Sequence, residues 1–322
     1  MNQSLITCRT CSSRSCHGYL IAEDLNQGKS NELFPYYLCN DCSSIFLHPI
    51  PSNLGFFYSR DYPAYAVKNS EDIENDFNCL EHAKLEIVRQ YVPSGKLVEI
   101  GPAAGRFLSV ASRAGYEVLG IEQDAECVEY IKNTLGLDVK LSNKPADELS
   151  QIEAGCDVIV AWHVIEHLQD LKGFVSAASK AISKPGGVMV VSAPNPQAWS
   201  FKIFGRFWVH LDAPRHLTLI PLEALDQLMT DQGLERIACI YDDPVGLKLN
   251  RMGWQNSLMN LSRNRSLRQP WLAVLGRIMS VAMSLFDRMS RGGAAYTVVY
   301  KKTMAGNKNP AVSNGDILLF EQ

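Results

Sequence analysis

The sequence lacks both a secretion signal and a membrane-spanning segment. Its first residues, MNQSLITCRTCSS, do not place a basic stretch before an apolar one, which is the pattern of a signal peptide. No uncharged apolar run reaches about 18 residues, the length that a membrane-spanning helix needs. We therefore expect a cytoplasmic protein whose cysteines stay reduced.

An excess of one charge is also absent. The net charge is -3 over 322 residues, of which 20% are charged and 46% are hydrophobic. This composition gives no indication of a polyelectrolyte partner, so we expect no specific binding of nucleic acid. The length suffices for one large α/β domain with a small appendage.

The nine cysteines include two CxxC pairs near the amino terminus. In a reducing compartment such pairs bind metal more often than they form disulfides. Thiolates on two tight turns can close a tetrahedron around Zn²⁺, and a short segment has little other means of building a core. We predict a zinc ribbon over residues 1–50, with four reduced thiols in a loop as the alternative and with Cys16 and His17 outside the ligand set. The predicted zinc ligands are Cys8, Cys11, Cys39 and Cys42.

Residues 97–108, LVEIGPAAGRFL, have the pattern of a strand, a tight turn and a helix that starts near Ala104. The unbroken apolar run before the turn is typical of a parallel strand buried on both faces. Gly101 and Gly105 let the backbone turn sharply and let a ligand approach it, and unpaired amides at the helix start favour an electronegative ligand. Ala103 replaces the second glycine of the dehydrogenase fingerprint, so that class fits poorly.

Two acidic residues narrow the choice of ligand. Glu122 ends the next expected strand, 21 positions after Gly101, the spacing at which a carboxylate reaches ribose hydroxyls in doubly wound sheets. Glu99 lies just before the turn, so Glu99-x-Gly101-x-x-x-Gly105 resembles the acidic-x-Gly-x-x-x-Gly signature of class I S-adenosylmethionine-dependent methyltransferases. The resemblance implies S-adenosyl-L-methionine as the cofactor.

Three further segments resemble the same family. Residues 156–168, CDVIVAWHVIEHL, are very similar to the post-strand motif of class I small-molecule methyltransferases, including ubiquinone-pathway O-methyltransferases, in which the loop lines cofactor and acceptor. Residues 212–216, DAPRH, also match. Residues 39–65 resemble the zinc-ribbon leader of methyltransferases tied to surface-polysaccharide and sugar modification. We expect Tyr58 and Tyr62 in this leader to face the active site or to pack against the main domain.

The alternation of strands and helices predicts an α/β fold class. The expected architecture is a doubly wound, Rossmann-like sheet of seven strands with a small amino-terminal zinc ribbon and a helical insertion before the last strand. The predicted domains are a zinc-ribbon-like leader, a linker, a class I methyltransferase domain and a flexible tail, at residues 1–50, 51–78, 79–302 and 303–322. The resemblance implies that the cofactor contacts Glu99, Gly101, Ala103, Gly105, Glu122, Asp147 and Trp162. Asp147 would accept the adenine amino group; a plain helix-start carboxylate is the alternative.

Histidines are the expected groups for acceptor chemistry. Because the sulfonium methyl is already activated, the protein has to align acceptor and donor and to remove a proton where needed. Imidazole titrates near neutral pH and can take a hydroxyl proton. The candidate bases are His163, His167, His210 and His216, of which we predict that His163, His167 and His216 are catalytic.

The segment HVIEH also allows a metal site. If a helix begins at His163, then Glu166 and His167 share its face. HxxEH occurs in inverted zinc peptidases, but its place after a parallel strand argues against that class. Some methyltransferases with ExxEH at this place hold a divalent ion, and with His216 as a fourth ligand the set would suit zinc, iron or manganese better than magnesium. Metal-free acceptor binding, base catalysis and packing are the alternatives.

Residues 246–292 depart from class I enzymes, which usually have a short hairpin before the last strand. The segment contains one acidic residue, Asp287, and eight basic ones: Lys248, Arg251, Arg263, Arg265, Arg268, Arg277, Arg288 and Arg291. Its net charge of +7 leaves -10 for the remainder of the chain. The apolar run at 271–286 is too short to span a bilayer, but it suits a membrane interface or a lid over the cleft.

The predicted function is S-adenosylmethionine-dependent methyl transfer, at oxygen, to a small-molecule, sugar or lipid-linked saccharide acceptor. The alternatives are C-methylation of a nucleotide-linked sugar and an inactive module that binds the cofactor or a partner. Retention of Glu99, Gly101, Gly105 and Glu122 argues against the inactive module. The predicted location is the cytoplasm, with peripheral contact to the inner face of the membrane through residues 246–292.

Overall fold

The structure is a computed structural model that describes residues 6–58, 78–152, 155–182, 185–262, 270–289 and 291–303. Most of the predicted linker, including Tyr62, and nearly all of the predicted tail lie outside these residues. Four of the basic residues of the insertion are affected as well, because residues 263–269 and the surroundings of the Arg288 side chain are not described.

The leader, a name used from here on for residues 6–58, forms a small antiparallel sheet. Its elements are β1 (Cys16–Ala22), β2 (Phe34–Cys39) and β3 (Ile45–Leu47), followed by the 3-10 helix η1 (Leu54–Phe57). A fourth strand, β9 (Thr218–Leu219), comes from the main domain and pairs with β3, so the order is β1-β2-β3-β9. Leu47 of the leader shares a buried core with Leu219 and Trp254. The domain boundary at residue 50 stays a prediction, since the two parts are joined by a sheet and a core.

The main domain is built on a seven-stranded sheet, which confirms the predicted fold class. The strand order is β10-β11-β8-β7-β4-β5-β6, and every neighbouring pair is parallel except the two that involve β11. The strands are β4 (Lys96–Ile100), β5 (Glu117–Glu122), β6 (Val139–Leu141), β7 (Val158–Trp162), β8 (Val188–Pro194), β10 (Leu234–Ile240) and β11 (Ala295–Lys302).

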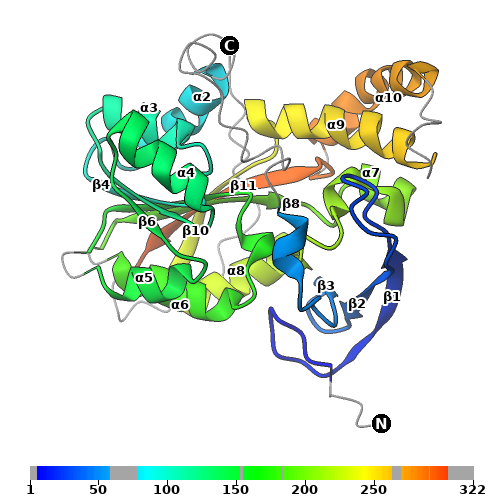
Figure 1. Cartoon of the computed structure of the whole chain (residues 1–322), viewed down its shortest axis with the longest axis horizontal. Helices are drawn as coiled ribbons and strands as arrows, with labels where there is room; N and C mark the ends of the chain where they lie inside the picture. Colours follow the sequence, from blue (N-terminus) through cyan, green and yellow to red (C-terminus); the bar gives the residue numbers. More distant parts are fainter. Residues whose placement is uncertain are drawn as a thin grey trace.

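Helices cover both faces of this sheet (Figure 1). One layer holds α2 (Asn78–Arg89), α3 (Arg106–Arg113) and α4 (Ala125–Tyr130), and the other holds α5 (Pro145–Ser150), α6 (Leu171–Ala181) and α8 (Leu222–Thr230). Consecutive residues of β4 belong to opposite cores, Leu97 to the first layer and Val98 to the second. This two-sided burial is why the strand is an unbroken apolar run. The π-helical turn η3 (Ile131–Leu135) extends α4 and ends at Gly136.

The long loop after β8 connects the main sheet to the leader. It folds as α7 (Trp199–Phe204), then the 3-10 helices η5 (Gly205–Phe207) and η6 (Val209–Leu211), and then β9. The Leu217 amide donates a hydrogen bond to the Glu166 carbonyl at 2.7 Å, so this loop also contacts the segment that follows β7.

The insertion between β10 and β11 is helical, as predicted. It comprises α9 (Pro244–Asn260) and α10 (Pro270–Met289), and α10 packs on α9 at the periphery of the molecule (Figure 1). Asp243 caps α9 by accepting the amides of Val245 and Gly246, both at 3.0 Å. No helix in the described part of the chain is long and apolar enough to cross a membrane.

Candidate functional site

A cavity of about 1180 Å³ lies at the carboxyl edge of the main sheet. The loops that follow β4 and β7 line it, and these two strands flank the point where the strand order reverses. Such a switch point is where doubly wound sheets bind ligands. The outer walls come from one face of α9, through Met252 and Met259, and from the leader, through Asn26 and Tyr58. Among the described residues of the insertion, those of α9 line the cavity and none of α10 does, so the lid prediction applies to α9 rather than to the apolar run.

Glu122 organises the glycine turn. Its Oε2 accepts the Ala103 amide at 2.8 Å, and its Oε1 accepts the amides of Gln123 and Asp124 at 2.8 and 2.9 Å. Burial raises the pKa of this carboxyl, and the three amides oppose that effect. Glu122 lines the cavity at the end of β5, where the ribose was predicted. The amides of Gly101 and Gly105 are also hydrogen-bonded within the protein. At these two positions the turn therefore has backbone carbonyls and apolar surface, rather than free amides, to contact a ligand.

The two glycines of the turn are required by packing. Their φ angles of +65° and +72° lie in the left-handed region. A Cβ at Gly101 would lie 2.8 Å from a methyl of Val164, and one at Gly105 would lie 2.7 Å from Cγ1 of Ile131. Gly105 precedes α3, which starts at Arg106 rather than near Ala104, and it does not line the cavity. The prediction that Gly105 contacts the cofactor therefore has no support in the geometry.

Glu99 contributes to the cavity lining a buried carboxyl with one oxygen that has no hydrogen-bond partner. The side chain is 3% exposed and its Oε2 has no hydrogen-bond partner. Burial raises its pKa to about 8, although the nearby Lys84 ammonium opposes the shift. Lys84 itself pairs with Glu81 at 2.9 Å. A buried carboxylate without a partner costs free energy unless a ligand supplies a donor or a cation, so this end of the cavity fits a cationic ligand.

Trp162 and Asp147 also line the cavity. The Trp162 ring meets Phe107 edge-on at 5.4 Å, Lys84 Nζ lies 5.4 Å from its centre, and its buried Nε1 has no hydrogen-bond partner. Asp147 is exposed in the first turn of α5 and lines the cavity. Its position agrees with both predicted roles, an adenine contact and a helix-start carboxylate.

The loop after β7 does not form the helix that a shared face would need. His163 has a left-handed φ of 57°, and only the 3-10 helix η4 (Ile165–His167) follows it. Glu166 and His167 instead meet His216, and their potential ligand atoms all lie within 4.8 Å of one another. His163 is outside this group, although its Nδ1 lies 3.7 Å from Glu166 Oε1. The structure thus assembles three of the four residues predicted as metal ligands.

Backbone carbonyls orient the two imidazoles of this cluster. His167 Nδ1 lies 3.0 Å from the carbonyl of Arg215, and His216 Nδ1 lies 2.8 Å from the carbonyl of His210. Because a carbonyl only accepts, each Nδ1 carries the proton and each Nε2 offers a lone pair. Tyr58 of the leader also contacts His167 Nδ1, at 2.9 Å, which confirms that Tyr58 faces the site. The fourth candidate base, His210, is tied by its own Nε2 to the Leu249 carbonyl at 2.9 Å.

The cluster holds a buried negative charge. Glu166 is fully buried and neither carboxylate oxygen has a hydrogen-bond partner. Burial disfavours its ionised form, but the imidazoles of His163, His167 and His216 outweigh burial and lower its pKa. Burial also lowers the pKa of His167 to about 4. At neutral pH an ionised carboxylate therefore faces a neutral imidazole of His167, a donor set that suits a divalent ion or a hydroxyl group.

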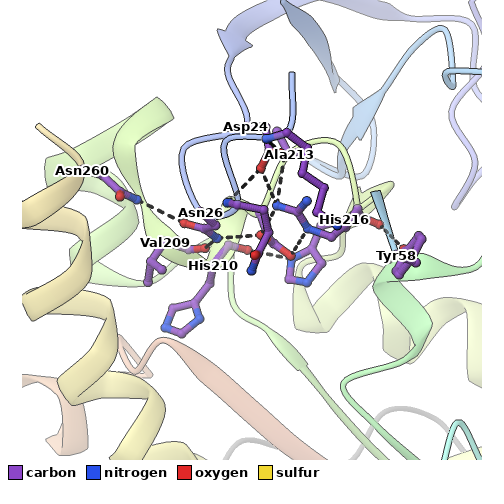
Figure 2. A network of polar contacts seen from close by, with 12 residues as sticks. Asp24, Asn26, Tyr58, Val209, His210, Ala213, His216 and Asn260 are labelled. Carbon is purple, nitrogen blue, oxygen red and sulfur yellow. Dashed lines mark hydrogen bonds and ion pairs between the residues drawn. The ribbon is translucent and has the colours of Figure 1, made fainter. Parts of the chain in front are cut away.

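The leader holds the loop that carries His216 (Figure 2). Arg215 is fully buried, and its Nη2 lies 2.7 Å from carboxylate oxygens of both Asp24 and Asp212. Asn26 donates to the Asp212 carboxylate at 2.6 Å and to the Val209 carbonyl at 2.7 Å. Tyr36 of β2 donates to the His216 carbonyl at 2.8 Å. Sequence reasoning missed these leader residues, since their partners are about 180 to 190 positions away in the chain.

The four predicted zinc ligands come together at the other end of the leader. Cys8 and Cys42 have their sulfurs 3.6 Å apart, Cys11 and Cys39 3.5 Å apart, and all four sulfurs lie within 4.8 Å of one another. A tetrahedron with Zn–S bonds of about 2.3 Å has sulfurs about 3.8 Å apart, so the cluster fits zinc. Cys16, expected to be a spectator, donates instead to the Ser13 carbonyl.

The sequence is similar to those of known methyltransferases. Residues 76–238 match the family described as "Methyltransferase domain". A ubiquinone biosynthesis O-methyltransferase of Cereibacter sphaeroides is 27% identical over 172 residues, 51% of this chain and 67% of that protein. One of Brucella anthropi is 28% identical over 173 residues, 50% of this chain and 67% of that protein. A solved S-adenosylmethionine-dependent methyltransferase of Archaeoglobus fulgidus is 17% identical, with a TM-score of 0.49, and the match covers 72% of this chain and 97% of that one.

The family match covers half of the chain and includes β4, β5 and β7, whose carboxyl ends line the cavity. The sheet topology is the one that this resemblance implied. The chain therefore belongs to the methyltransferase domain family and is a class I S-adenosylmethionine-dependent methyltransferase.

Proposed function

We propose that this enzyme methylates a hydroxyl oxygen of a small-molecule acceptor. The observation that carries the proposal is the buried cluster of Glu166, His167 and His216, in which lone pairs converge and the carboxylate has no hydrogen-bond partner. A hydroxyl group is a donor that satisfies such acceptors. The relatives from Cereibacter sphaeroides and Brucella anthropi, which are named O-methyltransferases, support oxygen as the acceptor atom.

His216 is the proposed base. Its Nδ1–H is engaged by the His210 carbonyl, so Nε2 is free to take the acceptor proton. As that proton leaves, the oxygen bonds to the methyl carbon, and the carbon–sulfur bond breaks to give a neutral thioether. Glu166 Oε1, 4.0 Å from Nε2, stabilises the imidazolium that forms. His167 has too low a pKa to act as a base at neutral pH, so we assign it and His163 to orienting the acceptor.

The donor side is proposed to hold S-adenosylmethionine, which supplies the activated methyl group. Glu122 at the end of β5 is positioned for the ribose hydroxyls, and Asp147 for the adenine amino group. Glu99 offers a buried carboxylate to the positive charges of the ligand. Gly101, Ala103 and Trp162 supply the surface between them.

A divalent ion would fit the same acceptor cluster. The residues that would hold it are Glu166, His167 and His216, and the orphaned Glu166 carboxylate with two Nε2 lone pairs is a donor set for zinc, iron or manganese. Such an ion would orient an acceptor hydroxyl and make its proton easier to remove. A histidine that binds a metal generally donates its other ring N–H to an oxygen acceptor. The carbonyls of Arg215 and His210 accept the Nδ1–H groups of His167 and His216 in this way.

The resemblance of the leader to those of other methyltransferases supports a proposal for the chemical class of the acceptor. Because the leader resembles those of methyltransferases that modify surface polysaccharides and sugars, we propose a sugar or lipid-linked saccharide with a free hydroxyl as the acceptor. Leader residues Asn26, Leu54 and Tyr58 line the cavity, which places the leader where it can contact the acceptor.

The test is methyl transfer from isotope-labelled S-adenosylmethionine to extracts of the source cells, followed by NMR of the labelled product. We expect a methoxy carbon. His216→Gln and Glu166→Gln should abolish transfer and leave cofactor binding unchanged by calorimetry, whereas His17→Gln, an exposed control on β1, should behave as the wild type. A C-methyl product, or full transfer by both site variants, would contradict the proposal.

A further inference from the structure

We propose that the outward face of α10 lies on an anionic lipid bilayer, parallel to its surface. The inward face of this helix packs against the rest of the protein, where Leu272, Met279 and Met283 contact the core shared with the leader. At the end of the helix Asp287 accepts the Trp254 indole N–H at 2.9 Å.

The outward face is apolar and exposed. Seven large side chains on it are 40–74% exposed: Trp271, Val274, Leu275, Ile278, Val281, Leu285 and Phe286. They recur at intervals of three and four residues, with two adjacent pairs (Val274 with Leu275, Leu285 with Phe286), so at 3.6 residues per turn they form one stripe along a helix about 30 Å long. An apolar surface of this extent marks a contact with another molecule or with lipid.

The charge around the stripe decides between lipid and a second copy of the chain. Residues 246–286 contain no acidic residue, and Asp287 is buried. Arg277 is exposed beside the stripe, and the sequence places Arg263, Arg265 and Arg268 just before the helix. A symmetric dimer that pairs this face antiparallel would bring Arg277, near the middle of α10, close to its copy, whereas an anionic leaflet would attract it.

The helix suits a position in the plane of the membrane rather than across it. Arg277 places a charge next to the stripe near the middle of α10, and the helix is not long and apolar enough to cross a membrane. Trp271 lies in the first turn, and an indole ring prefers the boundary between headgroups and acyl chains. The opposite face of the neighbouring α9 lines the cavity, so this contact would place the cavity one helix away from the lipid surface.

Vesicle flotation of the full-length protein tests the proposal. We expect binding to vesicles that contain phosphatidylglycerol at low salt, weaker binding at high salt, and little binding to pure phosphatidylcholine. Ile278→Asp/Val281→Asp should bind at least about tenfold more weakly, because two carboxylates would face the anionic leaflet. The matched control is Leu33→Asp/Leu141→Asp, which changes residues that are 61% and 55% exposed elsewhere and should bind as the wild type.

Two further measurements keep the result interpretable. Calorimetry with S-adenosylmethionine verifies that both double variants are folded, and quenching by brominated lipids should reach Trp271 and be lost in Trp271→Phe. The proposal is overturned if the wild type ignores anionic vesicles at low salt, or if the α10 variant floats like the wild type or no worse than the control. It is also overturned if light scattering shows a dimer that the α10 variant dissociates, since a second copy would then cover the stripe.

Discussion

The buried carboxyl of Glu99 should make cofactor binding depend on pH. Burial raises its pKa to about 8, and its Oε2 has no hydrogen-bond partner. In the ligand-free protein at pH 7 about nine-tenths of this carboxyl is therefore protonated. A cation beside it favours the ionised form, so binding of S-adenosylmethionine through its sulfonium or ammonium group should release a proton.

The expected magnitude follows from the shift. If Glu99 is fully ionised in the complex, affinity rises about tenfold from pH 6 to pH 7 and levels off above about pH 8. The effect on folding has the opposite sign. Between about pH 4.5 and 8 the folded, ligand-free protein keeps a proton that the unfolded chain has released, so stability falls as the pH rises through this window. Glu99→Gln should stabilise the ligand-free protein at pH 8 and weaken cofactor binding there.

Titration calorimetry between pH 6 and 7, in buffers with different heats of ionisation, measures both the affinity and the protons released. Glu99→Gln is the control for the titration of the cofactor's own amino group, whose pKa is about 8. We expect the wild type to show the steep pH dependence and the variant to show little. Parallel curves for the two proteins, or proton release that the variant retains, would refute the assignment of Glu99 to a ligand cation.

Three other predictions concern the turn, the ribose contact and the leader. Gly105→Ala should lower the free energy of unfolding, measured in urea, by about 2 kcal/mol or more. The control Gly136→Ala has a similar φ of +67° but nothing within 4 Å of the new Cβ, so it should lower that free energy by only about 1 kcal/mol. Equal losses in the two variants would contradict the packing argument. Glu122→Ala should weaken S-adenosylmethionine binding by about 1–3 kcal/mol, and unchanged affinity in calorimetry would remove Glu122 from the site. Protein purified without chelator should contain about one zinc per chain by elemental analysis and lose it in Cys39→Ser; less than about half an equivalent would count against the ribbon.

That Glu99, Gly101 and Glu122 line one cavity could be predicted because these residues are close together in the sequence. Glu99 and Gly101 belong to one strand and its turn, and Glu122 ends the next strand, so spacing and the resemblance to the family signature predicted that they contact the cofactor. Gly105 shows the limit of this reasoning. The pattern correctly required a glycine, but the reason is the side chain of Ile131 in a later helical turn rather than a ligand.

The helical interpretation of HVIEH failed for a physical reason. The Glu166 carbonyl accepts the amide of Leu217 rather than one from the next helical turn. Asp170 already caps α6 by accepting the Gly173 amide at 2.9 Å, which leaves too few residues for a separate helix. The segment becomes a 3-10 turn, and the third member of its cluster, His216, comes from a loop about fifty positions later. Local periodicity cannot show a pairing of this kind.

The cluster of Glu166, His167 and His216 is assembled from segments far apart in the sequence, which contact each other directly and are also held by the leader. Arg215, next to His216, is neutralised by Asp24 of the leader as well as by its neighbour Asp212. Such a buried cation is tolerable only with both partners in place, because the loss of one would leave an uncompensated charge. Tyr36 holds the carbonyl of His216 from the same sheet whose second strand ends at Cys39. A metal that fixes the cysteine end of this sheet would therefore also fix the position of the proposed base, although the two sites share no residue.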